Sequence, residues 1–279
     1  MDTVAETQRA LNRTSAERWQ LFADHRARVT DLALSAIRVH DTRICVLGAG
    51  NCNDLDLRRI AGAGARIHLV DIDGDALERA IQRQGMTTGD DFVLHPGIDV
   101  SGVAPMLDAA RNGGADIDAL ILAADAPRTL ELPGAFDLVI SSGVLTQLVR
   151  AAAGALGEDH ARLDDVAIAL RAGHFRTLVD LLRPGGRALL VTEVASSESL
   201  PGMALANDDA LGALLLRAIA TGQLFMATNP AAMLHWLGAA RPAGARLAAP
   251  GLVGPWRWQL SPRLQLLVVG LLLRRPVSP

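Results

Sequence analysis

The chain has 279 residues, of which 50% are apolar and 20% charged, with a formal net charge of -3 and a pI near 6.2. This length allows two small domains or one large α/β domain with an insertion, and the acidic balance argues against a general nucleic-acid partner. All 27 basic residues are Arg and there is no Tyr, which excludes a Schiff-base lysine, a Walker-type phosphate loop and a tyrosine acid or base.

Cysteine spacing and apolar tracts indicate the compartment. Cys45 and Cys52 flank a glycine-rich turn at a spacing that is typical neither of a disulfide framework nor of a paired-cysteine metal site. The segment 1–19 has no apolar signal region, and the most apolar tract, 264–273, is about half the roughly 20 residues that a membrane helix needs. We expect a cytoplasmic protein without a membrane partner or a bound metal.

The N-terminal region is predicted to form an amphipathic helix over 15–38. Thr14 and Glu17 have the spacing of a capping box. The apolar residues behind them recur at helical intervals; they are Trp19, Phe22, Val29, Ala33 and Ala36. His25 and Arg26 lie on or beside this apolar stripe, so we expect Arg26 either to extend along the helix edge or to bind a carboxylate of a cofactor or substrate.

From residue 44 to residue 194, apolar runs typical of buried strands alternate with helical patterns. The strands are predicted over 44–47, 66–71, 92–94, 136–141 and 187–194. The helices are predicted over 55–61, 75–84, 103–111, 143–148 and 162–182. This alternation is typical of a doubly wound, mostly parallel, Rossmann-like sheet in an α/β protein.

The last part of the chain departs from this alternation. Two helical segments, 210–220 and 230–237, precede two apolar runs, 256–260 and 263–274, which predict an antiparallel hairpin. We therefore expect three parts. They are an N-terminal helical lid at 1–40, a cofactor-binding domain at 41–200 and 250–279, and a helical cap inserted at 201–249.

A glycine-rich turn follows the first predicted strand. Gly48, Ala49 and Gly50 precede a helix, so backbone N–H groups and the helix N-terminus can face a carboxylate or phosphate. Asp71 ends the second predicted strand, where an acidic residue can accept hydrogen bonds from both hydroxyls of a ribose. These two features fit a nucleotide-type cofactor, and they also fit a tight turn with a solvated Asp.

Five segments, taken in order, resemble the motifs of class I S-adenosylmethionine-dependent methyltransferases. They are ICVLGAGNCN, HLVDID, HPGIDVSG, FDLVISSGVLTQL and LLRPGGRALLVTEV. The resemblance implies a seven-stranded sheet completed by the terminal hairpin, with S-adenosyl-L-methionine as the cofactor. It places the methionine end of the cofactor at the glycine turn and the adenosine at the next two strands.

The resemblance also implies roles for individual residues. Asp71 would bind the ribose hydroxyls, Ile72 and Val100 would lie at the adenine, and Asp99 would face the adenine amino group. Ser141 and Ser142 would line the floor beneath the sulfonium.

Two positions depart from the family pattern. Val46 stands where an acidic residue is usual, and Cys52 stands where a third glycine is usual. Asp54 or Asp56 is therefore the alternative partner for the methionine ammonium. We interpret Cys52 as a small turn residue rather than a reactive thiol.

The chemistry beyond the cofactor is predicted from position. Methyl transfer from a sulfonium chiefly needs alignment of the nucleophile, the methyl group and the sulfur, and it needs a base only when the acceptor carries a proton. Glu193, at the end of the fifth predicted strand, is the candidate base. The candidate substrate residues are Trp19, His25, Arg26 and Gln147.

The sequence thus predicts a methyltransferase acting on a small-molecule acceptor. The alternatives are an NAD(P)-dependent oxidoreductase, which the glycine turn and Asp71 favour, and an aminopropyltransferase-like enzyme on the same fold. A binding protein with a relict pocket is the non-enzymatic alternative.

Overall fold

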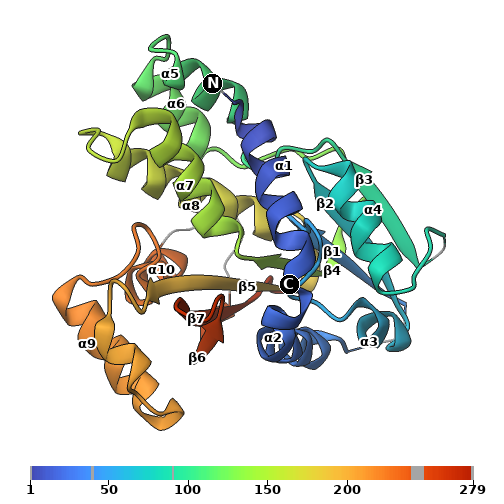
Figure 1. The fold of residues 1–279 in the computed structure, drawn as a ribbon. Helices are drawn as coiled ribbons and strands as arrows, with labels where there is room; N and C mark the ends of the chain where they lie inside the picture. The colour runs from blue at the N-terminus through green and yellow to red at the C-terminus, as the bar shows by residue number, and fades with distance from the viewer. Residues whose placement is uncertain (1, 39–40, 90, 240–247, 278–279) are drawn as a thin grey trace.

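The computed structural model of the protein describes residues 2–38, 41–89, 91–239 and 248–277 (Figure 1). Seven strands form one sheet in the order β3-β2-β1-β4-β5-β7-β6. The parallel strands are β1 (Thr42–Leu47), β2 (Ala65–Asp71), β3 (Phe92–Pro96), β4 (Phe136–Ser142) and β5 (Leu182–Ser196). The strand β7 (Gln265–Arg274) runs antiparallel to β5 on one side and to β6 (Ala248–Gln259) on the other. The predicted doubly wound sheet with a terminal hairpin is confirmed.

The central strands are apolar on both faces because helices cover both sides of the sheet. Ile44 and Val46 of β1 pack in one core with α2 (Ala23–Ala36), α3 (Leu57–Gly62) and α4 (Gly74–Arg83). Cys45 and Leu47 point to the opposite core, where α8 (Leu163–Asp180) and α10 (Pro230–Ala239) pack. A four-residue run of buried side chains is the pattern expected of such a strand.

The remaining helices extend these two layers. A third core lies among α5 (Ala104–Arg111), α6 (Ile117–Asp125), α7 (Val144–Leu156) and α8. The helix α9 (Leu211–Thr221) packs on a fourth core with Val194 and Leu267, next to the short helices η2 (Pro201–Ala204) and η3 (Asp208–Ala210). Met233 and Leu237 of α10 belong to the same core as Cys45 and Leu47 of β1. The division into lid, domain and cap stays a prediction, because these contacts do not separate the parts.

The N-terminal region differs from the single helix predicted over 15–38. It contains α1 (Val4–Ser15), the 3-10 helix η1 (Ala16–Phe22) and α2. The capping box is formed by Thr3 and Glu6, which have the same spacing as the predicted pair. The hydroxyl of Thr14 instead donates to the Ala10 carbonyl inside α1. The prediction of a cap at Thr14 was wrong because that residue lies within an earlier helix.

Two other elements depart from prediction. The helix α6 lies in a stretch that was predicted to have no element, and Asp116 caps it by accepting hydrogen bonds from Asp118 N and Ala119 N. The strand β5 begins at Leu182, the last residue of the helix predicted over 162–182, and not at 187 as predicted. Within the described residues, no helix has the length and apolar character needed to cross a membrane.

Candidate functional site

The site lies at the carboxyl ends of the parallel strands, where β1 continues into the glycine turn. Gly48 and Gly50 have φ angles of 62° and 49°, a left-handed conformation that glycine adopts without strain. A Cβ atom at Gly48 would lie 2.5 Å from Cγ2 of Val144, the first residue of α7. Glycine at position 48 therefore lets the turn pass directly against α7.

Asp71, the last residue of β2, holds the glycine turn in place. Its Oδ2 accepts a hydrogen bond from the Gly50 N–H at 2.9 Å, and its Oδ1 accepts from the Asp73 N–H at 2.8 Å. Burial raises the pKa of Asp71, whereas these two N–H groups lower it. Each carboxylate oxygen can accept a second hydrogen bond, so Asp71 retains capacity for the hydroxyls of a ligand.

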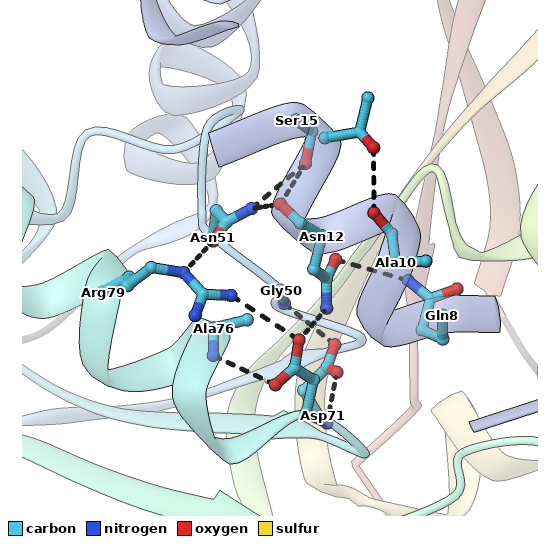
Figure 2. Close-up of polar contacts among 11 residues, drawn as sticks. Gln8, Ala10, Asn12, Ser15, Gly50, Asn51, Asp71, Ala76 and Arg79 are labelled. Carbon is cyan, nitrogen blue, oxygen red and sulfur yellow. Dashed lines mark hydrogen bonds and ion pairs between the residues drawn. The ribbon is translucent and has the colours of Figure 1, made fainter. Parts of the chain in front are cut away.

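The helix α1 lies over the same turn (Figure 2). Asn51 Nδ2 donates to the Asn12 carbonyl at 2.6 Å and to Ser15 Oγ at 3.0 Å. Asn12 Nδ2 donates to Asp73 Oδ2 at 3.0 Å, and Arg79 Nη2 lies 3.6 Å from the same oxygen. Side chains from α1, the turn and the start of α4 therefore form one connected polar network.

Two cavities adjoin each other beside this network. The larger has a volume of about 810 Å³ and the smaller about 60 Å³, and both are lined by Gln8, Gly48 and Gln147. Of the predicted site residues, the larger cavity is lined by Gly48, Ala49, Gly50, Ser142, His25, Gln147 and Glu193. The smaller cavity is lined by Asp71, Ile72, Asp99 and Val100. The residues predicted for adenosine are thus brought together, and α1 covers them through Val4 and Gln8.

Asp99 shapes the loop that follows β3. Its Oδ1 accepts hydrogen bonds from Ser101 N at 2.8 Å and Ser101 Oγ at 2.6 Å, and its Oδ2 accepts from Ala104 N at 2.9 Å. These bonds place the carboxylate at the start of α5. One acceptor direction on Oδ2 remains for a ligand.

Three predicted site residues lie outside the linings of both cavities: Ser141, Trp19 and Arg26. Ser141 is buried, and its Oγ lies 2.8 Å from Nε2 of His174 in α8. Arg26 Nη1 donates to the carbonyls of Trp19 and Asn53, both at 2.9 Å, and its guanidinium carbon lies 3.5 Å from the Trp19 ring centroid. Arg26 therefore joins η1 to the end of the glycine turn, and contact with a ligand carboxylate stays a prediction.

Glu193 is 9% exposed and faces the larger cavity from the end of β5. Its Oε2 lies 2.6 Å from the hydroxyl oxygen of Thr146, which also lies 3.0 Å from the Gly143 carbonyl. Burial raises the pKa of Glu193, the Thr146 hydroxyl lowers it, and the charge of nearby Asp54 raises it further. A carboxyl group with a raised pKa binds a proton more tightly than an ordinary carboxyl group, which suits a proton acceptor.

Asp54 and Asp56, the two alternatives for the methionine ammonium, are separated by the structure. Asp54 lines the larger cavity, and burial raises its pKa while a hydrogen bond with Ser142 lowers it. Asp56 caps α3 by accepting a hydrogen bond from Arg59 N at 3.0 Å. Only Asp54 of these two faces the cavity.

Several cavity residues were missed by the sequence reasoning. They are Asn12, Thr146, Phe225, Met226 and Trp258. Asn12 was missed because α1 was not predicted, although Thr3 and Glu6 carry its capping signal. Trp256 and Trp258 alternate along β6, and both belong to the core beneath α2, so the strand period could have placed them on one face.

Within 2–38, 41–89, 91–239 and 248–277, there is no group of three or more His, Cys, Asp or Glu side chains that could hold a metal ion. Cys52 is buried, and burial raises the pKa of its thiol well above the usual value. A buried, protonated thiol is a poor nucleophile. This agrees with the interpretation of Cys52 as a small turn residue and not a reactive thiol.

Comparison with solved structures gives similar folds. Magnesium protoporphyrin IX methyltransferase (ChlM) from Synechocystis PCC 6803, with bound SAH, is 15% identical over 90% of this chain and 81% of that chain, with a TM-score of 0.43. A candidate S-adenosyl-L-methionine-dependent methyltransferase from Methanococcus maripaludis is 11% identical over 100% of this chain and 96% of that chain, with a TM-score of 0.49. No protein-family model and no curated protein sequence matches the chain. At this identity and TM-score, the likeness does not by itself assign a function.

Proposed function

We propose that the protein is an S-adenosylmethionine-dependent methyltransferase that acts on a small-molecule acceptor. The observation that carries the proposal is the arrangement of the glycine turn, Asp71 and Asp99 around two adjoining cavities at the carboxyl ends of β1, β2 and β3. Ligands of open α/β sheets bind at this edge. The turn suits a charged amino acid group, and the two carboxylates suit a ribose and an adenine amino group.

The chain's own groups fit this cofactor. The close approach of Gly48 to Val144 leaves no room for a Cβ atom, and both carboxylates retain acceptor capacity. Asp71 would hold the ribose, Ile72 and Val100 would pack on the adenine, and Asp54 would face the methionine ammonium. When bound, the cofactor supplies a methyl group on a sulfonium for in-line displacement.

Glu193 serves as the proton acceptor in this proposal. If the acceptor is a hydroxyl group, its oxygen would gain the methyl group as the methyl–sulfur bond of the cofactor breaks, and Glu193 would take the proton that this oxygen loses. Thr146 then holds the other side of the carboxyl group through the 2.6 Å contact with Oε2. The side chains of Gln147 and Ser142 line the same cavity and can orient the acceptor.

Binding of S-adenosylhomocysteine to a charge-removing variant tests the proposal. Asp71→Asn is expected to weaken binding by about 1.5–3 kcal/mol, the size of a charged hydrogen bond. Asp75→Asn, an exposed substitution in the first turn of α4, is the matched control and should leave affinity unchanged. Isothermal titration calorimetry measures both. Equal affinity of Asp71→Asn and the unsubstituted protein would contradict the assignment of the ribose site.

A further inference from the structure

The lining of the larger cavity contains three packed aromatic rings, from Phe22, His25 and Trp258, which we call the aromatic wall. His25 stacks on Trp258 with ring centroids 4.2 Å apart and an interplanar angle of 13°. Phe22 meets Trp258 edge-on at 4.6 Å. Flat rings packed in this way present a surface suited to a planar apolar ligand.

The protonation of His25 is fixed by its neighbour in β6. Trp256 Nε1 lies 3.2 Å from His25 Nδ1. Because an indole nitrogen can only donate, Nδ1 must be the acceptor, and the neutral ring carries its proton on Nε2. Burial lowers the pKa of His25 to about 3, so the ring stays neutral at physiological pH. His25 is therefore a permanent Nε2–H donor.

In the part of the chain that the structure describes, His25 makes a hydrogen bond through Nδ1 and none through Nε2. The residue is 3% exposed and lines the cavity. A ligand oxygen in the cavity can therefore accept a hydrogen bond from this N–H group.

The charges of the cavity limit which oxygen suits this donor. The interior carboxyl groups are Asp54 and Glu193, and both have raised pKa values because they are buried. Arg18 and Arg150 line the same cavity, so charges of both signs face a ligand there. A cationic group cannot accept the hydrogen bond of His25. An uncharged oxygen, such as that of a carbonyl group, can accept it and is repelled by neither sign of charge.

The pairing of β5 and β6 with β7 indicates the length of a ligand that reaches from Glu193 to the pair formed by Trp256 and His25. Glu193 of β5 and Trp256 of β6 are both paired with Val268 of β7, on its two sides. Their backbones are thus two strand spacings apart, about 10 Å. A single aromatic ring with substituents at opposite ends fits a span of this size.

We propose that the acceptor is a planar hydroxylated aromatic compound carrying an uncharged carbonyl oxygen, with its hydroxyl at Glu193 and its carbonyl at His25 Nε2–H. The role of this compound as a methyl acceptor rests on the proposed function. Its binding to the aromatic wall does not, because the wall is built entirely from this chain. His25 is then a specificity-determining residue, and Trp256 is a positioning residue that acts through His25.

The test uses two phenols of similar size, para-hydroxyacetophenone, which has the carbonyl, and para-ethylphenol, which lacks it. Binding to the protein without cofactor is measured by calorimetry and by quenching of tryptophan fluorescence. We expect the ketone to bind about twofold to tenfold more tightly, as one additional neutral hydrogen bond implies. Equal affinity for the two phenols, or tighter binding of the anion para-hydroxybenzoate, would overturn the proposal.

Paired variants separate the contribution of the His25 N–H group to binding from that of its aromatic ring. His25→Phe keeps an aromatic ring and removes the N–H, so the preference for the ketone should fall to about one. His25→Gln places an amide N–H near the position of Nε2 and should retain the preference. His235→Phe, an exposed histidine in α10, is the matched control. An unchanged preference in His25→Phe would contradict the assignment.

The positioning role of Trp256 is tested by NMR spectroscopy of the His25 ring nitrogens. In Trp256→Phe the indole donor is lost, so the ¹⁵N chemical shifts of His25 should change from the pure Nε2–H tautomer to a mixture. A pure Nε2–H tautomer in this variant would overturn the positioning role. S-adenosylhomocysteine binding is measured separately in each variant. Its failure in the unsubstituted protein would reject the cofactor while leaving the phenol preference as an independent result.

Discussion

Glu193 is a buried carboxyl group whose partner, the Thr146 hydroxyl, has one proton and two acceptors within reach. That proton can lie toward the Gly143 carbonyl at 3.0 Å or toward Glu193 Oε2 at 2.6 Å. When Glu193 is protonated, it can donate to Thr146 while Thr146 donates to Gly143. When Glu193 is ionised, Thr146 can turn its proton to the carboxylate. The pair can therefore satisfy both protonation states of the Glu193 carboxyl group.

Replacement of Glu193 by Gln separates activity from stability. We expect Glu193→Gln to lower kcat by about 10²–10⁴-fold, the usual size of a general base contribution. The pKa of Glu193 is raised in the folded protein, so its ionisation disfavours folding as the pH rises above the ordinary value of about 4.3. Glu193→Gln should therefore raise the melting temperature at pH 8 more than at pH 4.

Thermal unfolding and steady-state rates across that pH range check this prediction. The activity of the unsubstituted enzyme should increase with pH through the raised pKa of Glu193, because the base acts when ionised. Glu78→Gln, an exposed substitution in α4, should change neither quantity. A melting temperature for Glu193→Gln that falls at pH 8 would show that the carboxylate is a stabilising group instead.

Arg26 shows how groups of the protein itself can hold a charge that lies on an apolar stripe. Its two hydrogen bonds and its stacking on Trp19 link η1 to the Asn53 carbonyl. We expect Arg26→Gln to lower the free energy of unfolding of the ligand-free protein by about 1.5–3 kcal/mol, as loss of charged hydrogen bonds implies. Urea unfolding measures this value, with the exposed Arg217→Gln as control. Unchanged stability together with weaker S-adenosylhomocysteine binding would instead place a ligand carboxylate at Arg26.

At the scale of elements, α1 is the segment that limits access to Asp71 and Asp99. Val4 and Gln8 line the smaller cavity of about 60 Å³, and α1 packs against α4 and α5 (Figure 1). An adenosine group is larger than this space, so α1 has to shift when it enters. The hydrogen bonds of Asn12 and Ser15 to the glycine turn and Asp73 are the contacts that such a shift would rearrange.

Hydrogen exchange of α1 tests this movement. We expect the amide protection of Val4–Ser15 to change when S-adenosylhomocysteine is added, while protection of the buried strand Thr42–Leu47 stays the same. Asn12→Ala, which removes the bond to Asp73, should increase exchange of α1 in the ligand-free protein. Identical α1 exchange with and without ligand, at saturation, would contradict the lid role.

Element boundaries were predictable where the hydrophobic period was unambiguous. The buried runs of β1, β2 and β4 each occur within two residues of their predicted positions. The break within the N-terminal region was not predictable, because apolar spacing continues from η1 into α2 while the backbone changes at Arg18, which has φ -90° and ψ 16°. The spacing of apolar residues along the sequence does not reveal such a local change of backbone conformation.

For the whole molecule, the alternation of strands and helices and the final hairpin sufficed to predict the seven-stranded sheet. The order β3-β2-β1-β4-β5-β7-β6 brings the ends of β1, β2 and β3 to one edge, which places the glycine turn, Asp71 and Asp99 around the cavities. The aromatic wall was not predictable, because it joins Phe22 and His25 to Trp258 across more than two hundred residues of sequence. Only the folded sheet sets such long-range pairs.

The central claim is that this edge of the sheet binds S-adenosylmethionine. It is tested most directly by calorimetric titration of the protein with S-adenosylmethionine, S-adenosylhomocysteine, decarboxylated S-adenosylmethionine, NAD and NADP under one set of conditions. We expect S-adenosylmethionine and S-adenosylhomocysteine to bind with one site per chain, the decarboxylated form to bind more weakly, and neither nicotinamide cofactor to give a binding heat. Preferential binding of NAD or NADP, or of the decarboxylated form, would contradict this account in favour of an oxidoreductase or an aminopropyltransferase.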